Sequence, residues 1–448
     1  MSDQIRLKKG LDLPISGAAL CEVTKRVAPG LVAVRPTDFR GMVPRLLVKE
    51  GDSVKAGTPL FADKKHAAMV FCSPVSGTVE AVIRGDKRKL LAVSVKADGK
   101  NESVQFDVPK ISSLGKKEMT DLLLSCGLWP CLKQRPFGTV ADPEAEPKCI
   151  FISGMNTAPL GADPEFALKD DFAAIQAGVD ALGKLTSGGV HFSLPARNFA
   201  GSEFHKLTGV IFHQFEGPHP AGNVGVQINH VCPINKGETV WTVDLHLVAV
   251  IGRLFLKGVY DARRIIAVAG PAAVKPAYAE VPAGVCMADL KEFFAPGAVR
   301  IVSGDVLSGE AIPADGFLGF YHNQVSVLPE GDYYEMFGWM NPLRSKKFSV
   351  SRAYPAFLRR KKYDMDTNEN GGERPFLMND VYGKVLPMDI YPLHLFKACL
   401  AGDLDKMEQL GIYEVLEEDV ALCEYVCPSK VEIQKIVREG IELMMKEM

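Results

Sequence analysis

One loop carries side chains suited to binding a flat ligand that has polar edges. It runs from Leu128 to Pro147 and places Trp129 and Phe137 close in sequence to the cations Lys133 and Arg135. Aromatic side chains can form an apolar wall, and cationic side chains can donate hydrogen bonds to the edge of a ring. The alternative is that the two aromatic side chains fill a junction between domains.

Three histidines, His213, His219 and His230, lie in or beside a loop rich in Gly and Pro. A transition metal needs three or four ligands, and partners in a second layer hold those ligands in place. The spacing of these histidines matches no helical zinc motif such as H-E-x-x-H. The sequence therefore predicts no metal site on this chain.

Two lysines, Lys64 and Lys65, lie in a segment from Val43 to Val82 in which Gly and Pro separate short strands. This segment resembles the biotinyl/lipoyl-like barrel-sandwich hybrid fold, in which a lysine at a hairpin tip carries a covalent cofactor. Here the two lysines lie ten and nine residues before Pro74, which is more than carrier hairpins usually have. We therefore expect a fixed scaffold, with a lipoyl- or biotin-type carrier protein as the alternative.

The length and composition bound the class of protein. A chain of 448 residues with 47% hydrophobic and 24% charged residues suggests roughly three or four globular domains. A formal net charge of −2 argues against a nucleic-acid partner. The longest apolar run, near Leu247–Ile251, is far shorter than the roughly 20 residues of a transmembrane helix, and no signal peptide is visible. We expect a cytoplasmic protein without a transmembrane helix.

The middle of the chain has the pattern of an α/β layer. Short buried strands are predicted at 149–154, 188–193 and 208–212, and a helix is predicted at 163–186. Strands that alternate with helices indicate a Rossmann-like parallel sheet. No G-x-G-x-x-G motif follows these strands, so the turn that holds a dinucleotide phosphate is missing. A long structured loop is expected next, at 216–235.

Four stretches of the chain resemble the NqrA family, whose members belong to the Na+-translocating NADH:quinone oxidoreductases. They are spread over nearly the whole sequence: IRLKKGLDLPISG (5–17), SGMNTAPLGADP (153–164), EGPHPAG (216–222) and YHNQVSVLPEG (321–331). In the third stretch the motif residues are Glu216, Gly217, Pro218, His219, Pro220 and Gly222. This family is similar to the flavin-binding subunit of respiratory complex I and to the RnfC protein of the Rnf complex.

The resemblance implies a multidomain α/β chain, α+β overall, built from four parts. These are an N-terminal β-rich region at 1–110 with a barrel-sandwich hybrid at about 36–98, a Rossmann-like domain without a nucleotide loop at 111–255, an SLBB-like β-grasp domain at 256–340, and a basic linker with a C-terminal helical domain at 341–448.

Comparison with these relatives predicts that this chain binds no cofactor. In complex I the loop equivalent to 126–139 is rich in glycine and lies against FMN and NADH, whereas here it carries Trp129 and other bulky residues. At the C-terminus, Cys423 and Cys427 keep only half of a ferredoxin-like cysteine motif, and two ligands cannot hold an iron–sulfur cubane. The resemblance places NADH, flavins and Fe–S clusters on partner subunits.

The resemblance also implies a function. The chain would be a peripheral subunit on the cytoplasmic face of the bacterial inner membrane, in a six-subunit complex with membrane-embedded partners. That complex couples NADH oxidation and ubiquinone reduction to Na+ export, and the isolated chain would be inactive, with no catalytic residue of its own. The quinone-binding candidates are Trp129, Lys133, Arg135 and Phe137, with Phe39 on a second wall. The alternative is a cofactor-free structural adaptor.

A basic segment at 344–362 contains eight Lys or Arg residues and no acidic residue. Within the family, such a segment would face lipid headgroups or a membrane-embedded subunit. The alternative is a solvated surface. The candidate docking residues are Arg344, Lys346, Lys347, Arg352, Arg359, Arg360, Lys361 and Lys362.

Overall fold

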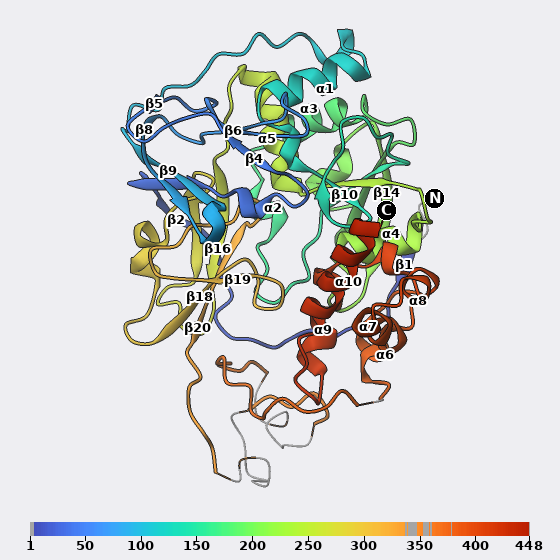
Figure 1. Cartoon of the computed structure of the whole chain (residues 1–448). Helices are drawn as coiled ribbons and strands as arrows, with labels where there is room; N and C mark the ends of the chain where they lie inside the picture. Colours follow the sequence, from blue (N-terminus) through green and yellow to red (C-terminus); the bar gives the residue numbers. More distant parts are fainter. Residues whose placement is uncertain are drawn as a thin grey trace.

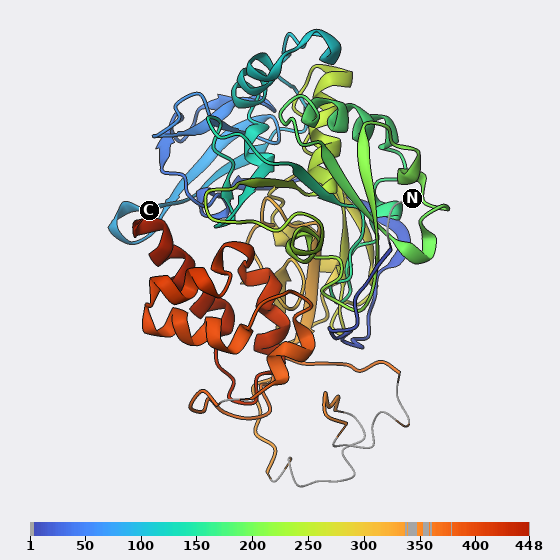
Figure 2. The ribbon, with the colours of Figure 1, turned by 90° about the vertical axis from the view of Figure 1, so that its right-hand side faces the viewer.

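The computed structural model describes residues 4–336, 338, 347–352, 358, 361–377 and 379–447. Its chain is divided into a small β module, an α/β layer, a second β-rich domain and a helical C-terminal domain (Figure 1). A view turned by 90° shows the red C-terminal helices packed beside the β module and the α/β layer (Figure 2). The predicted fold class is confirmed.

The β module consists of two small antiparallel sheets, with strand orders β3-β9-β8-β5 and β4-β6-β7. Leu60, Phe61 and Val93 are fully buried in its core. The predicted turns are confirmed, because Gly51 and Gly57 have φ angles of 90° and 92°, which suit glycine. The strands are β3 (Leu31–Val34), β4 (Pro44–Leu46), β5 (Ser53–Val54), β6 (Pro59–Asp63), β7 (Val70–Cys72), β8 (Gly77–Arg84) and β9 (Leu90–Ala97).

The first two strands belong to other sheets. β1 (Gln4–Arg6) pairs in parallel with β14 of the α/β layer, and β2 (Leu20–Arg26) pairs in parallel with β17 of the second β-rich domain. The N-terminal residues therefore link three parts of the molecule. The predicted domain boundaries stay predictions.

The α/β layer is a seven-stranded sheet of order β1-β14-β13-β12-β15-β10-β11, in which the first five strands run parallel. β10 and β11 are antiparallel to their neighbours. The strands are β10 (Leu132–Arg135), β11 (Thr139–Val140), β12 (Ile150–Ser153), β13 (Val190–Pro195), β14 (Val210–Glu216) and β15 (Val240–Val243). The helices are α1 (Lys116–Ser125), α2 (Pro164–Ala167), α3 (Phe172–Leu182), α4 (Val224–Val231) and α5 (Leu245–Lys257).

Two expectations for this layer were wrong in detail. The single helix predicted at 163–186 is divided into α2 and α3, and Asp171 in the break forms an ion pair with Arg253. The loop predicted at 216–235 contains helix α4, whose Val226 and Ile228 are buried. Gly225 and the polar residues of α4 weaken the helical pattern in the sequence. The helix forms because Val226 and Ile228 are buried by contacts with distant parts of the chain.

Helices α3 and α5 pack closely on one face of this sheet because glycines lie at their contact. A Cβ atom on Gly252 would lie 1.7 Å from the backbone oxygen of Ala174, and one on Gly178 would lie 2.3 Å from that of Val248. Any side chain larger than hydrogen at these positions would push the helices apart.

The second β-rich domain is a six-stranded sheet of order β19-β18-β20-β16-β17-β2. Ile266, Val268, Val325 and Val327 are fully buried in its core. Its strands after β2 are β16 (Arg264–Ala269), β17 (Ala277–Val281), β18 (Val299–Ser303), β19 (Glu310–Ile312) and β20 (Gln324–Pro329).

The C-terminal domain is helical and has a core of its own. Ile433, Val437 and Ile441 are fully buried along one side of its last helix, so this helix is amphipathic. The helices are α6 (Val381–Val385), α7 (Pro392–Ala401), α8 (Leu404–Gln409), α9 (Glu417–Val426) and α10 (Ile433–Glu447). The short 3-10 turns are η1 (Pro36–Asp38), η2 (Asp86–Arg88), η3 (Ile111–Ser113), η4 (Trp129–Cys131), η5 (Ala196–Asn198), η6 (Glu203–Lys206), η7 (Met287–Phe293) and η10 (Ile412–Glu414).

The glycine contact between α3 and α5 generates a stability prediction. Gly252→Ala should lower the free energy of unfolding by about 3 kcal/mol, because the added methyl group overlaps the backbone of α3. Gly383→Ala is the matched control, since nothing lies within 4 Å of a Cβ there. The control should change stability by less than about 1 kcal/mol. Equal effects of the two substitutions in urea unfolding would contradict the packing argument.

Candidate functional site

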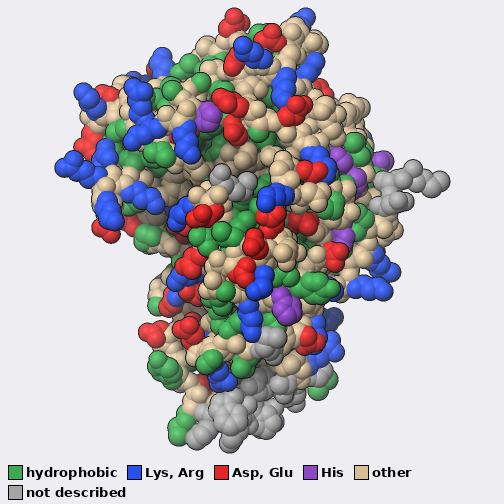
Figure 3. All heavy atoms as spheres, turned by 45° about the vertical axis from the view of Figure 1, so that its right-hand side comes forward, with side chains coloured by type: hydrophobic (Ala, Val, Ile, Leu, Met, Phe, Trp, Pro, Cys, Tyr) green, Lys and Arg blue, Asp and Glu red, His purple; other side chains and the backbone are tan. Residues whose placement is uncertain are grey.

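A cleft with a volume of about 980 Å³ opens where the four parts of the chain meet; we call it the four-part cleft. The β module contributes Phe39 and Arg40, the α/β layer contributes Lys133 and Asp244, the second β-rich domain contributes Phe320 and His322, and the helical domain contributes Glu417 and Arg438. The surface around these elements carries acidic and basic side chains intermixed (Figure 3).

The cleft lies at the carboxyl end of the parallel strands. Ser153 ends β12, Gly222 follows β14 and Asp244 follows β15, and all three line the cleft. The strand order reverses between β12 and β15, since β13 and β14 continue on one side of β12 while β15 lies on the other. Open α/β sheets bind ligands in the crevice that forms at such a reversal.

A lysine, a carboxylate and an aromatic ring form one side of the cleft. The Lys133 Nζ lies 3.2 Å from Asp244 Oδ2 and 4.6 Å from the centre of the Tyr321 ring. Burial lowers the pKa of Lys133, but Asp244 and Glu418 more than offset this effect, so the pKa is raised. Lys133 is therefore a permanent cation and hydrogen-bond donor at the cleft.

A buried arginine organises the next part of the wall. The Arg264 Nη1 donates to the backbone oxygens of Phe320 at 2.6 Å and His322 at 3.2 Å, and it lies 3.3 Å from His246 Nε2. Because the guanidinium can only donate, His246 Nε2 accepts and the imidazole carries its proton on Nδ1. Burial, with Arg264 as the next cause, lowers the pKa of His246 to about 3.

His322 is also held as a neutral group. Its Nδ1 lies 2.8 Å from the hydroxyl of Ser303, which accepts a hydrogen bond from the Gly319 backbone. Burial lowers the pKa of His322 below its ordinary value. His246 and His322 are therefore uncharged at neutral pH.

An aromatic cluster forms the apolar wall. The Phe39 ring lies 4.9 Å from Phe320, 5.9 Å from Tyr321 and 4.5 Å from Phe71, measured between ring centres. Phe39, Phe320 and Tyr321 line the cleft, while Phe71 supports them from the β module. This wall joins the β module to the second β-rich domain.

Ion pairs close the cleft on the side of the helical domain. The Arg135 Nη1 lies 2.7 Å from Asp419 Oδ2, and its Nη2 lies 2.5 Å from Glu418 Oε1. The side chains of Arg135 and Asp419 are almost fully buried. Glu417 beside them accepts from Arg40 at 2.6 Å. Because a buried ion pair is costly to separate, these contacts hold α9 at the cleft.

The motif loop after β14 lines the cleft without joining a metal site. His219 is buried, its amide donates to Asp12, and its Nδ1 lies 3.2 Å from the Thr157 hydroxyl. That hydroxyl accepts from the Gly222 amide at 2.8 Å. Glu216 forms an ion pair with Arg6, which fixes the start of the loop. The remaining motif residues are Gly217, Pro218 and Pro220.

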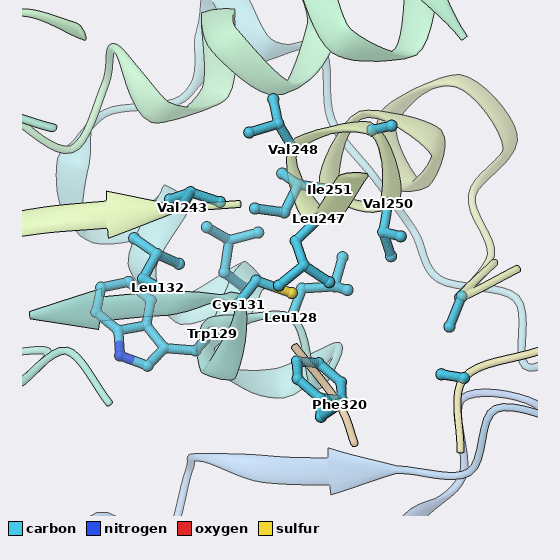
Figure 4. Close-up of a cluster of buried hydrophobic side chains, with 14 of the residues drawn as sticks. Leu128, Trp129, Cys131, Leu132, Val243, Leu247, Val248, Val250, Ile251 and Phe320 are labelled. Atoms are coloured by element: carbon cyan, nitrogen blue, oxygen red, sulfur yellow. The ribbon is translucent and has the colours of Figure 1, made fainter. Parts of the chain in front are cut away.

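The predicted quinone residues are separated by the structure. Lys133, Arg135 and Phe39 line the cleft. Trp129 lies in the core, where its Nε1 donates to the Ala141 oxygen at 2.7 Å (Figure 4). Phe137 packs on Tyr413 of the helical domain, with ring centres 6.0 Å apart.

Trp129 and Phe137 thus do not line the cleft, and their placement among the binding residues needs correction. Trp129 packs edge-on against Trp241, with ring centres 5.4 Å apart. The alternative, in which the aromatic side chains fill a junction between domains, describes Phe137, which packs against the helical domain, whereas Trp129 lies in the core of the α/β layer. Their sequence proximity to the two cations was misleading because β10 presents Lys133 and Arg135 on one face, whereas Trp129 precedes this strand and Phe137 follows it.

The three histidines considered for metal binding have separate partners. His213 Nε2 lies 2.8 Å from His191, His230 Nε2 donates to the Pro387 oxygen at 2.7 Å, and His219 contacts Thr157. In the described ranges, no group of three or more His, Cys, Asp or Glu side chains could hold a metal ion.

Two further pairs singled out in the sequence lie away from the cleft. Lys64 and Lys65 are exposed at the turn between β6 and β7. Cys423 and Cys427 are buried in the helical core, where the Cys427 sulfur lies 3.1 Å from the Tyr382 hydroxyl.

The basic segment is described only in part. Lys347 pairs with Asp366 at 3.2 Å, while Lys361 and Lys362 are exposed. Arg352 is also exposed. Arg344, Lys346, Arg359 and Arg360 lie outside the described residues.

Several cleft residues were missed by sequence reasoning. Asp244, His246 and His322 line the cleft, and Arg264 binds His246 and the His322 backbone behind it; these residues come from separate segments that only the fold brings together. The sequence held a local signal for Asp244, since this residue directly follows the short strand run Val240–Val243. Nothing in the local sequence indicated that Arg264 is buried.

Comparison with protein families agrees with this architecture. Residues 5–98 match the model of the NqrA N-terminal barrel-sandwich hybrid domain, residues 114–260 the NqrA second alpha/beta domain, and residues 265–313 the NQRA C-terminal domain of the SLBB type. These matches fall in the first three parts of the chain, one in each part.

Whole-chain relatives decide the family. The chain is 39% identical to the NqrA protein of the Na+-translocating NADH-quinone reductase of Yersinia pestis over 441 residues, which are 97% of this chain and 98% of the relative. It is 39% identical to the corresponding protein of Rhodopirellula baltica over 451 residues, covering 99% and 98%. This chain belongs to the NqrA family of Na+-translocating NADH-quinone reductase subunits.

Membership in the NqrA family confirms the resemblance found in the sequence. In the solved structure of an NAD+-reducing NiFe-hydrogenase in the H2-reduced state, one chain matches 76% of this chain and 65% of its own length, with 11% identity and a TM-score of 0.37. Within the part of this NqrA-family chain that the structure describes, no helix is both long and apolar enough to span a membrane.

The lowered pKa of His246 generates a prediction on stability and pH. The folded protein binds a proton there only near pH 3, whereas the unfolded chain binds it near pH 6.5, so stability is lost as pH falls between these values. From pH 7 to pH 5 the wild type should lose about 2 kcal/mol more than His246→Gln, which keeps an acceptor for Arg264.

Urea unfolding at the two pH values measures this difference. His394→Gln, at an exposed histidine of α7, is the control and should follow the wild type. Identical pH dependence of the wild type and His246→Gln would contradict the assignment of a neutral, buried His246.

Proposed function

We propose that this chain is a peripheral subunit on the cytoplasmic face of a Na+-translocating NADH:ubiquinone reductase complex, and that the four-part cleft forms or supports its ubiquinone site. The complex would couple NADH oxidation and ubiquinone reduction to Na+ export. NADH, flavins and Fe–S clusters would reside on partner subunits, and the isolated chain would not turn over.

This proposal is carried by one observation. An apolar wall and hydrogen-bond donors meet in the four-part cleft, where the strand order of the sheet reverses. A quinone headgroup is a flat ring with two carbonyl acceptors, so it needs an apolar slot and hydrogen-bond donors at its edge. Phe39, Phe320 and Tyr321 supply such a wall. Lys133 and the Nδ1–H of His246 are donors beside it.

The charges around the cleft favour an uncharged ligand. Most of its cations already have carboxylate partners within 3.2 Å, including Arg35 with Asp38, Lys133 with Asp244 and Arg135 with Asp419. An anionic ligand would have to displace one of these carboxylates, at the cost of leaving it unpaired. A neutral quinone can accept hydrogen bonds while the ion pairs stay intact.

Docking to membrane partners is a further part of the proposal. Among the described members of the basic segment, Lys361 and Lys362 are exposed and could approach an anionic surface or an acidic partner. The relatives are named as subunits of a reductase, which supports assembly with other chains. Lys347 already pairs with Asp366, so docking through this lysine would have to break that ion pair.

Isothermal titration with a short-chain ubiquinone tests the role of the cleft. The protein should bind the quinone, and Lys133→Met should weaken binding about tenfold or more, because a charged donor is lost. Lys236→Met is the matched control, since Lys236 also forms an ion pair, with Glu408, but lies outside the cleft. The control should bind like the wild type.

The assembled complex separates the proposal from the adaptor alternative. If the isolated chain needs its partners for binding, Lys133→Met should raise the KM for quinone in the complex while Lys236→Met leaves it unchanged. Absence of quinone binding by the isolated chain, together with an unchanged KM in the Lys133→Met complex, would contradict the proposal and favour a structural adaptor.

A further inference from the structure

The sulfur atoms of two cysteines, Cys149 and Cys232, are in contact. The Cys149 Sγ is 3.5 Å from the Cys232 Sγ, although the residues are 83 positions apart in the sequence. All ten cysteines of the chain are described and free, and among them this is the pair whose sulfur atoms are in contact. Cys149 directly precedes β12, and Cys232 directly follows α4.

The two thiols have different surroundings. Cys149 is 2% exposed and packs in an apolar layer with Phe151, Ile228 and Val240. Burial raises the pKa of Cys149 to about 12, with Cys232 as the next cause. Cys232 is partly exposed, so solvent and small oxidants can reach it.

A cation lies beside the more accessible thiol. The Lys148 Nζ donates to the backbone oxygen of Pro233, the residue that follows Cys232, at 3.2 Å. It also donates to Glu238 Oε2 at 2.9 Å. Glu238 is the largest cause of the raised pKa of Lys148, and Cys232 also contributes to it. The ammonium group therefore lies at the loop that carries the more accessible thiol.

The local backbone allows the sulfur atoms to approach. Cys149 is fixed in the sheet, because its oxygen accepts from the Trp241 amide at 3.1 Å. Cys232 stands at the end of α4, where the chain leaves the helix for a turn at Asn235–Glu238. A disulfide needs an S–S distance of about 2.05 Å, so the contact must shorten by about 1.5 Å. Movement at the end of α4 can supply this.

We propose that Cys149 and Cys232 form a modification site at which a peroxide converts two thiols into a disulfide. The Cys232 thiolate attacks one peroxide oxygen, the O–O bond breaks, and the sulfur becomes a sulfenic acid while one water leaves. Cys149 then attacks that sulfur and the S–O bond breaks. The leaving hydroxide takes up the thiol proton of Cys149 and departs as a second water. The sulfur atoms lose two electrons, and the peroxide gains them.

The bond would act on the helix that joins the cleft to the C-terminal domain. At the start of α4, Asn223 and Val224 line the cleft, and near its end Asn229 donates to Glu414 Oε2 at 2.7 Å. The adjacent His230 donates to the Pro387 oxygen. A disulfide would tie this helix to β12, so oxidation would restrict its movement relative to the sheet. This inference does not rest on the proposed quinone site.

Peptide mapping of the full chain tests the proposal. The folded protein is treated with hydrogen peroxide, the remaining thiols are alkylated under denaturing conditions, and the chain is cut with trypsin without reduction. We expect a linked pair of peptides, 149–169 and 207–236, each of which contains one cysteine. Its mass should be about 2 Da below the sum of the two free peptides and should be lost on reduction.

Variants and an unfolded control make the result specific. Cys149→Ser should leave Cys232 as a sulfenic acid that dimedone traps, whereas Cys286→Ser, at a buried cysteine elsewhere, should keep the linked pair. Peroxide treatment in urea should give much less linked product, because the contact depends on the fold. Full alkylation of both cysteines after treatment of the folded wild type, or sulfinic acid at Cys232 without any linked pair, would overturn the proposal.

Discussion

The buried guanidinium of Arg264 is the contact on which the cleft depends. It stands at the start of β16 and binds the backbone of Phe320 and His322 together with the ring of His246 at the start of α5. The contact with His246 holds the second β-rich domain against the α/β layer, and the two backbone contacts fix the loop before β20 within that domain. Burial and the neighbouring Arg264 keep His246 uncharged, with its proton on Nδ1. All three contacts use Nη1, while Nε and Nη2 have no hydrogen-bond partner among the described residues, so the loss of the Nη1 acceptors would leave the whole buried guanidinium unpaired.

From this junction the other parts of the cleft follow. The loop that Arg264 fixes carries Phe320 and Tyr321, which meet Phe39 of the β module and Lys133 of β10. On the opposite side, Arg135 binds the start of α9 and brings the helical domain to the same sheet edge. Internal ion pairs neutralise most of the charges, and the histidines are neutral. The result is a cavity of mixed polarity that suits a neutral ring better than a nucleotide phosphate.

The sequence predicted the parts of this protein better than their junctions. Period-two and helical patterns, Gly51 and Gly57 in turns, and the alternation of strands and helices are local signals, and the structure follows them. Helix α4 and the aromatic wall of the cleft depend on contacts between distant segments. Trp129 was misplaced because burial against Trp241 is a tertiary property. Lys133 and Arg135 were found because cations among aromatic side chains are visible locally, whereas Arg264 and His246 were not.

Photolabelling of the assembled complex tests the central claim most directly. A short-chain ubiquinone with a photoreactive group on its ring would be activated in the complex, and the labelled peptides would be mapped with and without an excess of unmodified quinone. The account predicts competed labelling within Leu132–Arg135 or Gly319–His322 of this chain. Competed labelling confined to partner subunits, with none on the segments that line the cleft, would contradict it.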